Sequence, residues 1–244
     1  MKILIIDIET RPNLAWCWGL WDQNVALNQI EQVGSVISWA AKWHKQKNVM
    51  FASVHHDGHD EMIKQVWELL DEADVVVGYN SKAFDMKHLN REFLAAGLPP
   101  PSPWIDIDLL SVVKQKFKFA SNKLDFVVRE LGIGSKAQHS GFDLWLGCMK
   151  EDPKSWSLMK KYNCQDVVIT EKLYDRLLPW IKHHPTRGIY TGELRNCPRC
   201  GHNDMIIRKY ATTKTGRYPV MQCKKCQGYS RMSKADRRSN ISSI

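Results

Sequence analysis

The sequence has no long hydrophobic run and no leader pattern. No apolar stretch among its 244 residues approaches the roughly 20 residues that cross a membrane. The N-terminus lacks the basic start, the apolar segment and the small-residue cleavage site of a signal peptide. There is no internal repeat and no long low-complexity segment. These absences argue against membrane-spanning and repeat proteins, and we expect an intracellular, cytoplasmic protein with no membrane partner.

Excess positive charge is missing from most of the chain. Residues 1–186 hold 22 Lys and Arg against 23 Asp and Glu, a formal charge of −1. Residues 187–244 hold 13 against 3, a formal charge of +10, so the whole excess of +9 lies at the C-terminal end. This asymmetry predicts two modules and a polyanionic partner. A basic tail that only aids solubility is the alternative.

Cysteine is scarce outside two pairs. Three cysteines are isolated and are interpreted as buried or idle thiols: Cys17, Cys148 and Cys164. The other four form two Cys-x-x-Cys pairs with 22 residues between the pairs: Cys197, Cys200, Cys223 and Cys226. In an intracellular chain this spacing is typical of a four-cysteine zinc site, and the residues between the pairs can form a hairpin. We therefore predict a zinc ribbon whose single structural Zn²⁺ supplies most of its folding energy.

One stretch with the pattern of a buried strand ends in two acids. The apolar run Ile3–Ile6 leads directly into Asp7, and Ile8 separates Asp7 from Glu9. Because side chains alternate along a strand, the two carboxylates project side by side from a buried central strand. Like charges this close destabilise the fold unless a cation lies between them, and Mg²⁺ or Mn²⁺ prefers such oxygen ligands. The alternative is that one carboxylate faces solvent at the strand end.

Hydrophobic periodicity predicts an α/β core. Strands are expected at residues 3–9, 36–43, 49–54, 75–79 and 104–106. Helices are expected at residues 59–70, 86–96, 109–117, 124–131 and 155–178. The first three strands should form an antiparallel meander, and residues 132–154 should be loop with a helical fragment.

Tryptophan is concentrated in the loop that follows the first strand. Residues 13–34 contain Trp16, Trp18 and Trp21 within six positions. A loop that leaves the strand at its acidic end overhangs the carboxylates. Its indoles could stack on nucleic-acid bases or cover the sheet as a hydrophobic pad, and the pad is the preferred interpretation.

Three acidic motifs follow one another along the chain. They are Asp7-Ile8-Glu9-Thr10, Asn80-x-x-x-Phe84-Asp85 and Tyr162-x-x-x-Asp166. With these motifs the chain, from residue 1 to about residue 180, resembles the DEDD superfamily of 3′–5′ exonucleases. This ribonuclease H-like group includes polymerase proofreading domains. Because a tyrosine stands four residues before the last aspartate, this motif resembles that of the tyrosine subclass rather than that of the histidine subclass.

The resemblance implies both a fold and a chemistry. The fold is a ribonuclease H-like mixed five-stranded sheet flanked by helices. Two Mg²⁺ or Mn²⁺ ions roughly 3.5–4 Å apart are implied, and they activate water and stabilise the departing 3′ oxygen. Their implied ligands are Asp7, Glu9, Asp85 and Asp166. Tyr162, together with Glu9, would orient the attacking water. Asn80 and Phe84 are the implied substrate contacts.

Several of these residues have an alternative structural role. Asp85 is also a typical helix N-cap, Asn80 a typical turn residue and Tyr162 a typical core residue. Asp108 is expected to hydrogen-bond within the fold and is left out of the metal set. His139, in a loop, is a further candidate contact to the scissile phosphate.

These features together predict four segments. They are a ribonuclease H-like 3′–5′ exonuclease domain (1–182), a linker (183–192), a four-cysteine zinc ribbon (193–232) and a basic polar tail (233–244). The expected reaction releases nucleoside 5′-monophosphates from a single strand or the 3′ end of a duplex, with DNA favoured over RNA. A structure-specific endonuclease on the same scaffold and a non-catalytic nucleic-acid adaptor are the alternatives, although four converging acids argue against an adaptor. The ribbon is also a candidate surface for a protein partner.

Overall fold

The computed structural model describes residues 1–135 and 141–239. His139 and the last residues of the predicted tail lie outside the described residues. The contacts divide the chain into two compact units, which we call the sheet unit (residues 2–173) and the ribbon unit (residue 1 with residues 174–244). The four segments expected from the sequence, with boundaries at residues 182, 192 and 232, stay a prediction. Within the described ranges, no helix combines the length and the apolar character needed to cross a bilayer.

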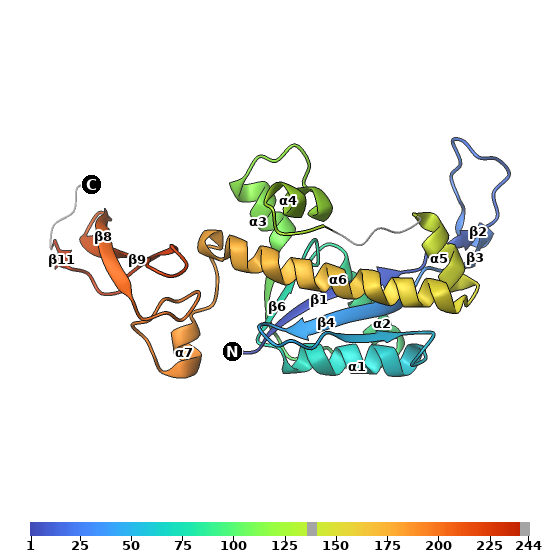
Figure 1. The fold of residues 1–244 in the computed structure, drawn as a ribbon, viewed down its shortest axis with the longest axis horizontal. Coiled ribbons are helices and arrows are strands. Elements are labelled where there is room, and N and C mark those ends of the chain that lie inside the picture. The colour runs from blue at the N-terminus through green and yellow to red at the C-terminus, as the bar shows by residue number, and fades with distance from the viewer. Residues whose placement is uncertain (136–140, 240–244) are drawn as a thin grey trace. The chain divides into compact units, whose positions relative to one another are not determined.

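The sheet unit is built on five strands in the order β5-β4-β1-β6-β7 (Figure 1). Their bounds are β1 (Ile3–Thr10), β4 (Val36–Trp43), β5 (Met50–Ser53), β6 (Val75–Gly78) and β7 (Ile105–Asp108). β4 runs antiparallel to β1 and β5, whereas β6 runs parallel to β1 and β7. The predicted mixed sheet and its N-terminal antiparallel meander are therefore confirmed.

Five helices of the sheet unit lie close to their predicted positions, and α5 is the helical fragment expected within residues 132–154. Their bounds are α1 (His59–Glu72), α2 (Asp85–Ala95), α3 (Leu109–Lys116), α4 (Leu124–Glu130), α5 (Phe142–Met149) and α6 (Pro153–Leu177, which continues into the ribbon unit). The prediction for the fifth strand ended too early, at residue 106. The strand continues because Ile107 and Asp108 still pair with Val77 and Gly78 of β6.

The alternation of side chains along β1 separates its core residues from its acids. Three of its side chains pack into the core that includes α1 and α2: Leu4, Ile6 and Ile8. Asp7 and Glu9 occupy the alternate positions, so they face the other side of the sheet. Helix α6 lies across that side (Figure 1). The strand pattern thus directs the two carboxylates toward α6.

A buried ion pair fixes α6 to β4. The ammonium group of Lys42 on β4 pairs with the Glu171 carboxylate on α6, and both side chains are largely shielded from solvent. The second oxygen of Glu171 accepts a hydrogen bond from the backbone N–H of Lys45 at 2.7 Å. One carboxylate therefore holds both the end of β4 and the turn after it against the helix.

The loop at residues 13–34 does not cover the sheet, so the preferred pad interpretation is wrong. Trp16, Trp18 and Trp21 are 72%, 97% and 83% exposed. The loop forms a narrow ladder instead, in which β2 (Leu14–Ala15) pairs with β3 (Ile30–Gln32). This ladder prolongs the β1–β4 pair, and the segment between its strands extends outward beyond it (Figure 1). Cys17, in the same segment, is likewise exposed rather than buried.

The ribbon unit contains the predicted hairpin. β8 (Met205–Thr212) pairs antiparallel with β9 (Gly216–Cys223), which also pairs with β10 (Tyr229–Arg231) and β11 (Arg237–Arg238). Two short helices precede the hairpin, η2 (Leu178–Trp180) and α7 (Arg187–Thr191). The Arg199 guanidinium donates to the Ile181 carbonyl at 3.0 Å, which ties the first cysteine turn to the segment after η2.

The buried ion pair gives a first prediction. Glu171→Leu should destabilise the sheet unit by about 3–5 kcal/mol, because Lys42 would remain buried without its carboxylate. The double variant Lys42→Met/Glu171→Leu should lose less, since no buried charge is left unpaired. Urea unfolding monitored by circular dichroism measures both.

Lys2→Met is the matched control for this prediction. It removes an exposed pair with Glu72 and should cost less than about 1 kcal/mol. Equal losses in the Glu171 single variant and the double variant would contradict the proposed role of the pair.

Candidate active site

Three carboxylates from two elements meet where β1 passes the end of β6. The pairing of β1 with β6 reaches only Ile5, so the strand continues alone on that side through Asp7 and Glu9. Asp7, Glu9 and Asp166 of α6 each offer one oxygen, and these oxygens all lie within 4.8 Å of one another. Asp166 is buried, whereas Asp7 and Glu9 are partly exposed. The arrangement is therefore partly open to solvent.

Asp85 lies beside this group but is not one of the three. Its Oδ1 accepts a hydrogen bond at 3.2 Å from the backbone N–H of Ile8, the residue between Asp7 and Glu9. That N–H is available because β6 does not pair with β1 there. Asp85 is the first residue of α2, whose N-cap position is occupied by Phe84. The carboxylate is thus directed at the backbone of β1 and does not act as the N-cap of its own helix.

A tight turn brings Asp85 to β1. A Cβ added at Gly78 would lie 2.6 Å from the Ser81 Cβ, so only glycine allows this approach. Asn80 adopts a left-handed conformation with φ of 69°, and its carbonyl accepts from the N–H groups of Ala83 and Phe84. The backbone of Asn80 therefore has the turn role that was one of its two expected roles.

Asp108 supports the same turn. Its Oδ1 accepts from the N–H groups of Asn80 and Leu110, each at 2.9 Å, and its Oδ2 accepts from the Ser111 hydroxyl at 3.2 Å. It therefore caps α3 and hydrogen-bonds within the fold, as expected, outside the group of three acids.

Tyr162 and Asp166 share α6 and lie four residues apart. Tyr162 is largely buried in a core cluster with Ile37 and Trp156, and its ring meets the Trp145 ring edge-on with centroids 6.1 Å apart. This packing fixes the ring on the face of α6 that turns toward the acids. Its core role and a role in the site are compatible.

Phe84 is placed differently from the buried groups. It is 39% exposed, and its ring lies 4.5 Å from the ring of His88 on the next turn of α2. One part of the Phe84 ring is therefore accessible close to Asp85.

Sequence reasoning missed Asn163 and Ser38. The Asn163 amide donates to the Asp7 carboxylate at 2.7 Å and to the Asp7 carbonyl at 3.2 Å, while its oxygen accepts from the Ser38 hydroxyl at 3.1 Å. Both side chains are fully buried. An asparagine in a helix interior is the available signal, because a buried amide needs partners. The pair joins β4, α6 and Asp7 in one chain of hydrogen bonds.

Burial and neighbouring acids both disfavour the ionised forms of Asp85 and Cys148. Burial raises the pKa of Asp85 to about 7 against the effect of the Ile8 N–H, and Asp108 and Asp106 raise it further. Burial, Asp152 and Glu9 together raise the pKa of the Cys148 thiol to about 11. The isolated Cys148 is buried, as expected, and it stays neutral. Carboxylate oxygens held this close together fit a hard divalent cation such as Mg²⁺ or Mn²⁺.

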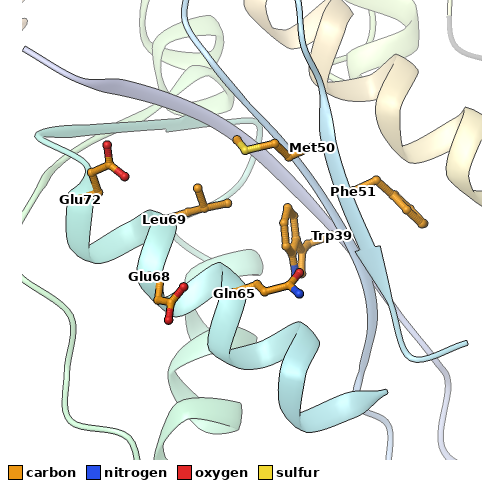
Figure 2. Close-up of a pocket in the computed structure, with 7 residues that line it drawn as sticks. All are labelled: Trp39, Met50, Phe51, Gln65, Glu68, Leu69 and Glu72. Carbon is orange, nitrogen blue, oxygen red and sulfur yellow. The ribbon is translucent and has the colours of Figure 1, made fainter. Parts of the chain in front are cut away.

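Two hollows lie elsewhere on the sheet unit. One, of about 390 Å³, is lined by Arg11, His55 and Trp156 among others, and His55 stacks on Trp156 with centroids 5.3 Å apart. Figure 2 shows the other, of about 470 Å³, between the sheet residues Trp39 and Phe51 and side chains of α1. None of the clustered acids lines either hollow, so neither is the candidate reaction site.

The four paired cysteines also come together. The Sγ atoms of Cys197 and Cys226 are 3.6 Å apart, as are those of Cys200 and Cys223, and all four lie within 4.8 Å. A tetrahedral ion with bonds of about 2.3 Å would separate its sulfurs by about 3.8 Å. The cluster is therefore consistent with a zinc ribbon.

The pKa of Asp85 gives a second prediction. Without added Mg²⁺ or Mn²⁺, stability should fall as pH rises from about 4, the ordinary aspartate pKa, to about 7. In that window the native state holds a proton that the unfolded state has lost. Asp85→Asn should flatten this decline in urea unfolding midpoints, whereas Glu68→Gln, at an exposed acid of α1, should leave it unchanged. An unaltered slope in Asp85→Asn would refute the assignment.

Comparisons with known proteins agree with this architecture. The model of the RNase H superfamily matches residues 4–178. The solved family B DNA polymerase from the hyperthermophilic archaeon Pyrobaculum calidifontis is similar in fold, with a TM-score of 0.56 and 20% identity. That match covers 73% of this chain but only 24% of the polymerase chain. No curated protein matches. Because the family match extends over most of the chain, the protein belongs to the RNase H superfamily.

Proposed function

We propose that this protein is a metal-dependent 3′–5′ exonuclease of the tyrosine subclass of DEDD enzymes. The observation that carries the proposal is the meeting of Asp7, Glu9 and Asp166 oxygens within 4.8 Å at the end of a central strand. Repulsion between carboxylates this close destabilises the fold. A protein that only bound nucleic acid would gain nothing from such an arrangement. Membership of the RNase H superfamily supports nuclease chemistry.

The proposed metal ligands are the three clustered acids and Asp85. Asp85 uses Oδ1 for the Ile8 N–H and offers Oδ2 to a cation. Two bound Mg²⁺ or Mn²⁺ ions would supply an activated water and would stabilise negative charge on the departing 3′ oxygen. The residues that would hold those ions are Asp7 and Glu9 from β1, Asp85 from α2 and Asp166 from α6.

The other proposed site residues do not bind metal but orient the water, the Asp7 carboxylate or the substrate. The Tyr162 hydroxyl orients the attacking water together with Glu9, since packing against Trp145 fixes its ring and Asp166 follows one turn later on α6. Asn163 is a positioning residue, because its amide fixes the Asp7 carboxylate. Phe84, with its accessible ring, and the Asn80 side chain are the proposed substrate contacts near the 3′ terminus.

The substrate is proposed to be nucleic acid, with DNA favoured over RNA. The structural neighbour is a DNA polymerase, and that likeness of fold supports DNA. The product is a nucleoside 5′-monophosphate released from the 3′ end of a single strand or duplex.

The ribbon unit is proposed to hold the substrate behind the reacting end. Its cysteines, when bound to Zn²⁺ as four thiolates, change the formal charge of residues 187–244 from +10 to +8. The exposed basic side chains of β8 and of the turn after β9, Lys209 and Lys225 among them, thus offer phosphate contacts that the acidic site cannot supply. A protein partner that docks on the ribbon is the competing explanation for this charge.

The third prediction tests the carboxylate site. Asp166→Asn should lower Mg²⁺-dependent degradation of end-labelled DNA and RNA at least about 100-fold, since it removes a metal ligand. Folding should be unchanged or stabilised, because a like charge is lost. Asp60→Asn, at an exposed acid of the same unit, is the control.

A second substrate in that experiment separates the nuclease types. A closed single-stranded circle has no 3′ end and should survive. Cleavage of the circle would show endonuclease action, and more than about a tenth of wild-type activity in Asp166→Asn would rule out the proposed metal assignment.

The fourth prediction tests the ribbon. Lys209→Gln/Lys225→Gln, at two exposed ribbon lysines, should weaken binding to long DNA. It should also reduce the slope of log affinity against log salt by about 0.7–0.9 per lost phosphate contact. Lys47→Gln/Lys64→Gln removes the same charge from exposed positions of the sheet unit and should have little effect. Equal slopes in the two double variants would favour a protein partner for the ribbon.

A further inference from the structure

The segment at residues 13–34, which we call the tryptophan arm, exposes large apolar side chains in an unusual concentration. Besides its three indoles, Leu20 and Leu27 are 91% and 87% exposed. Soluble proteins rarely present apolar groups together in this way unless the surface binds something. The metal chemistry of the proposed function makes no use of these side chains.

The arm is a built extension of the strands that carry the acids. The N–H of Arg11 donates to the Ser35 carbonyl at 2.9 Å, which continues the β1–β4 ladder into the arm. Farther out, Trp16 and Gln29 exchange hydrogen bonds, from the Trp16 N–H to the Gln29 carbonyl and from the Gln29 amide to the Trp16 carbonyl, each at 2.9 Å. The root of the arm therefore has a defined geometry.

The length of the arm sets its reach from the acids. Trp16 follows Glu9 by seven residues, which span at most about 23 Å at roughly 3.3 Å per extended residue. A dinucleotide held at the carboxylates covers only part of such a span, whereas a longer oligonucleotide covers all of it. The arm is therefore within the reach of a strand whose 3′ end lies at the carboxylates.

The charge of the arm restricts what it can bind. Residues 13–34 contain no Lys, Arg or His, and Asp22 and Glu31 give the arm a formal charge of −2. Such a surface forms no ion pairs with phosphates and gains nothing from an anionic membrane. An indole can stack on another flat aromatic ring without any ion pair. Unpaired bases expose such rings. In a duplex the same faces are already stacked inside the helix.

We propose that the tryptophan arm is a stacking surface for the unpaired bases of a nucleic-acid strand whose 3′ end lies at the carboxylates. The proposal rests on the proposed nuclease function for the position of that end. If the arm stacks on unpaired bases, the preferred substrate is single-stranded. Two parts of the chain then contribute to binding, the arm and the ribbon. The arm binds bases by stacking, and this contribution to affinity does not depend on salt. The ribbon binds phosphates, and its contribution falls as salt rises.

The test is a binding cycle with the full chain and no added Mg²⁺ or Mn²⁺. Its ligands are a 12-nucleotide oligothymidylate and an abasic strand of the same length, which keeps the phosphates and lacks the bases. Trp16→Leu/Trp18→Leu/Trp21→Leu should bind the thymidylate at least about tenfold more weakly and the abasic strand as the wild type does. Its salt dependence should be unchanged. The corresponding triple phenylalanine variant should recover most of the affinity, because it restores aromatic faces.

Matched variants and a second ligand control the experiment. Leu20→Ala/Leu27→Ala removes exposed apolar side chains of the same arm and should leave thymidylate binding unchanged. Hydrolysis of a dinucleotide should be the same in the wild type and in this double alanine variant, which keeps both the acids and the indoles. If neither protein hydrolyses it, the nuclease proposal fails, while the binding cycle still decides the role of the arm.

Four results would overturn the proposal. They are unchanged thymidylate binding in the triple leucine variant, an equal loss on the abasic strand, and a loss in the double alanine variant as large as in the triple variant. The fourth is a wild-type dimer that the triple variant converts to a monomer without loss of affinity, which would assign the arm to a second copy of this chain.

Discussion

Repulsion among acids is the constraint on which the rest of the sheet unit depends. Asp7, Glu9 and Asp166 are brought within 4.8 Å by two elements that are far apart in sequence, and this arrangement would open if either element could move. Three contacts prevent that movement. The Asn163 amide ties Asp7 to α6, the Ile8 N–H holds Asp85 at β1, and the Lys42–Glu171 pair fixes α6 to β4. The fold thus stores unfavourable electrostatic energy at one point and balances it with buried polar contacts nearby.

The same constraint explains why the two units have opposite electrostatic character. A site that concentrates acids attracts cations and repels a polyanion, so it is poorly suited to holding a long strand by charge. The formal +10 of residues 187–244 supplies attraction in a segment that contributes none of the clustered carboxylates. The clustered acids and the excess of basic residues are therefore carried by separate parts of the chain.

Those parts of the fold that depend on local periodicity could be predicted from the sequence. The alternation from Ile3 to Glu9 predicted a buried strand with two acids on one face, and the spacing of Tyr162 and Asp166 placed both on one helix. The Asn163–Asp7 hydrogen bond could not be predicted in this way, because it joins residues 156 positions apart. It requires knowing how α6 crosses the sheet, and neither strand nor helix periodicity contains that information.

The exposure of the tryptophan arm escaped prediction for a different physical reason. Hydrophobicity predicts burial only where a complementary surface is available, and the arm prolongs β1 and β4 beyond the sheet, so its indoles have no surface to cover. Trp156, by contrast, is buried because it lies on α6 and packs into a core cluster with Ile37 of β4. The two cases differ in backbone path and not in residue type. An apolar cluster on a segment that leaves the sheet is therefore better interpreted as a surface for a partner than as part of the core.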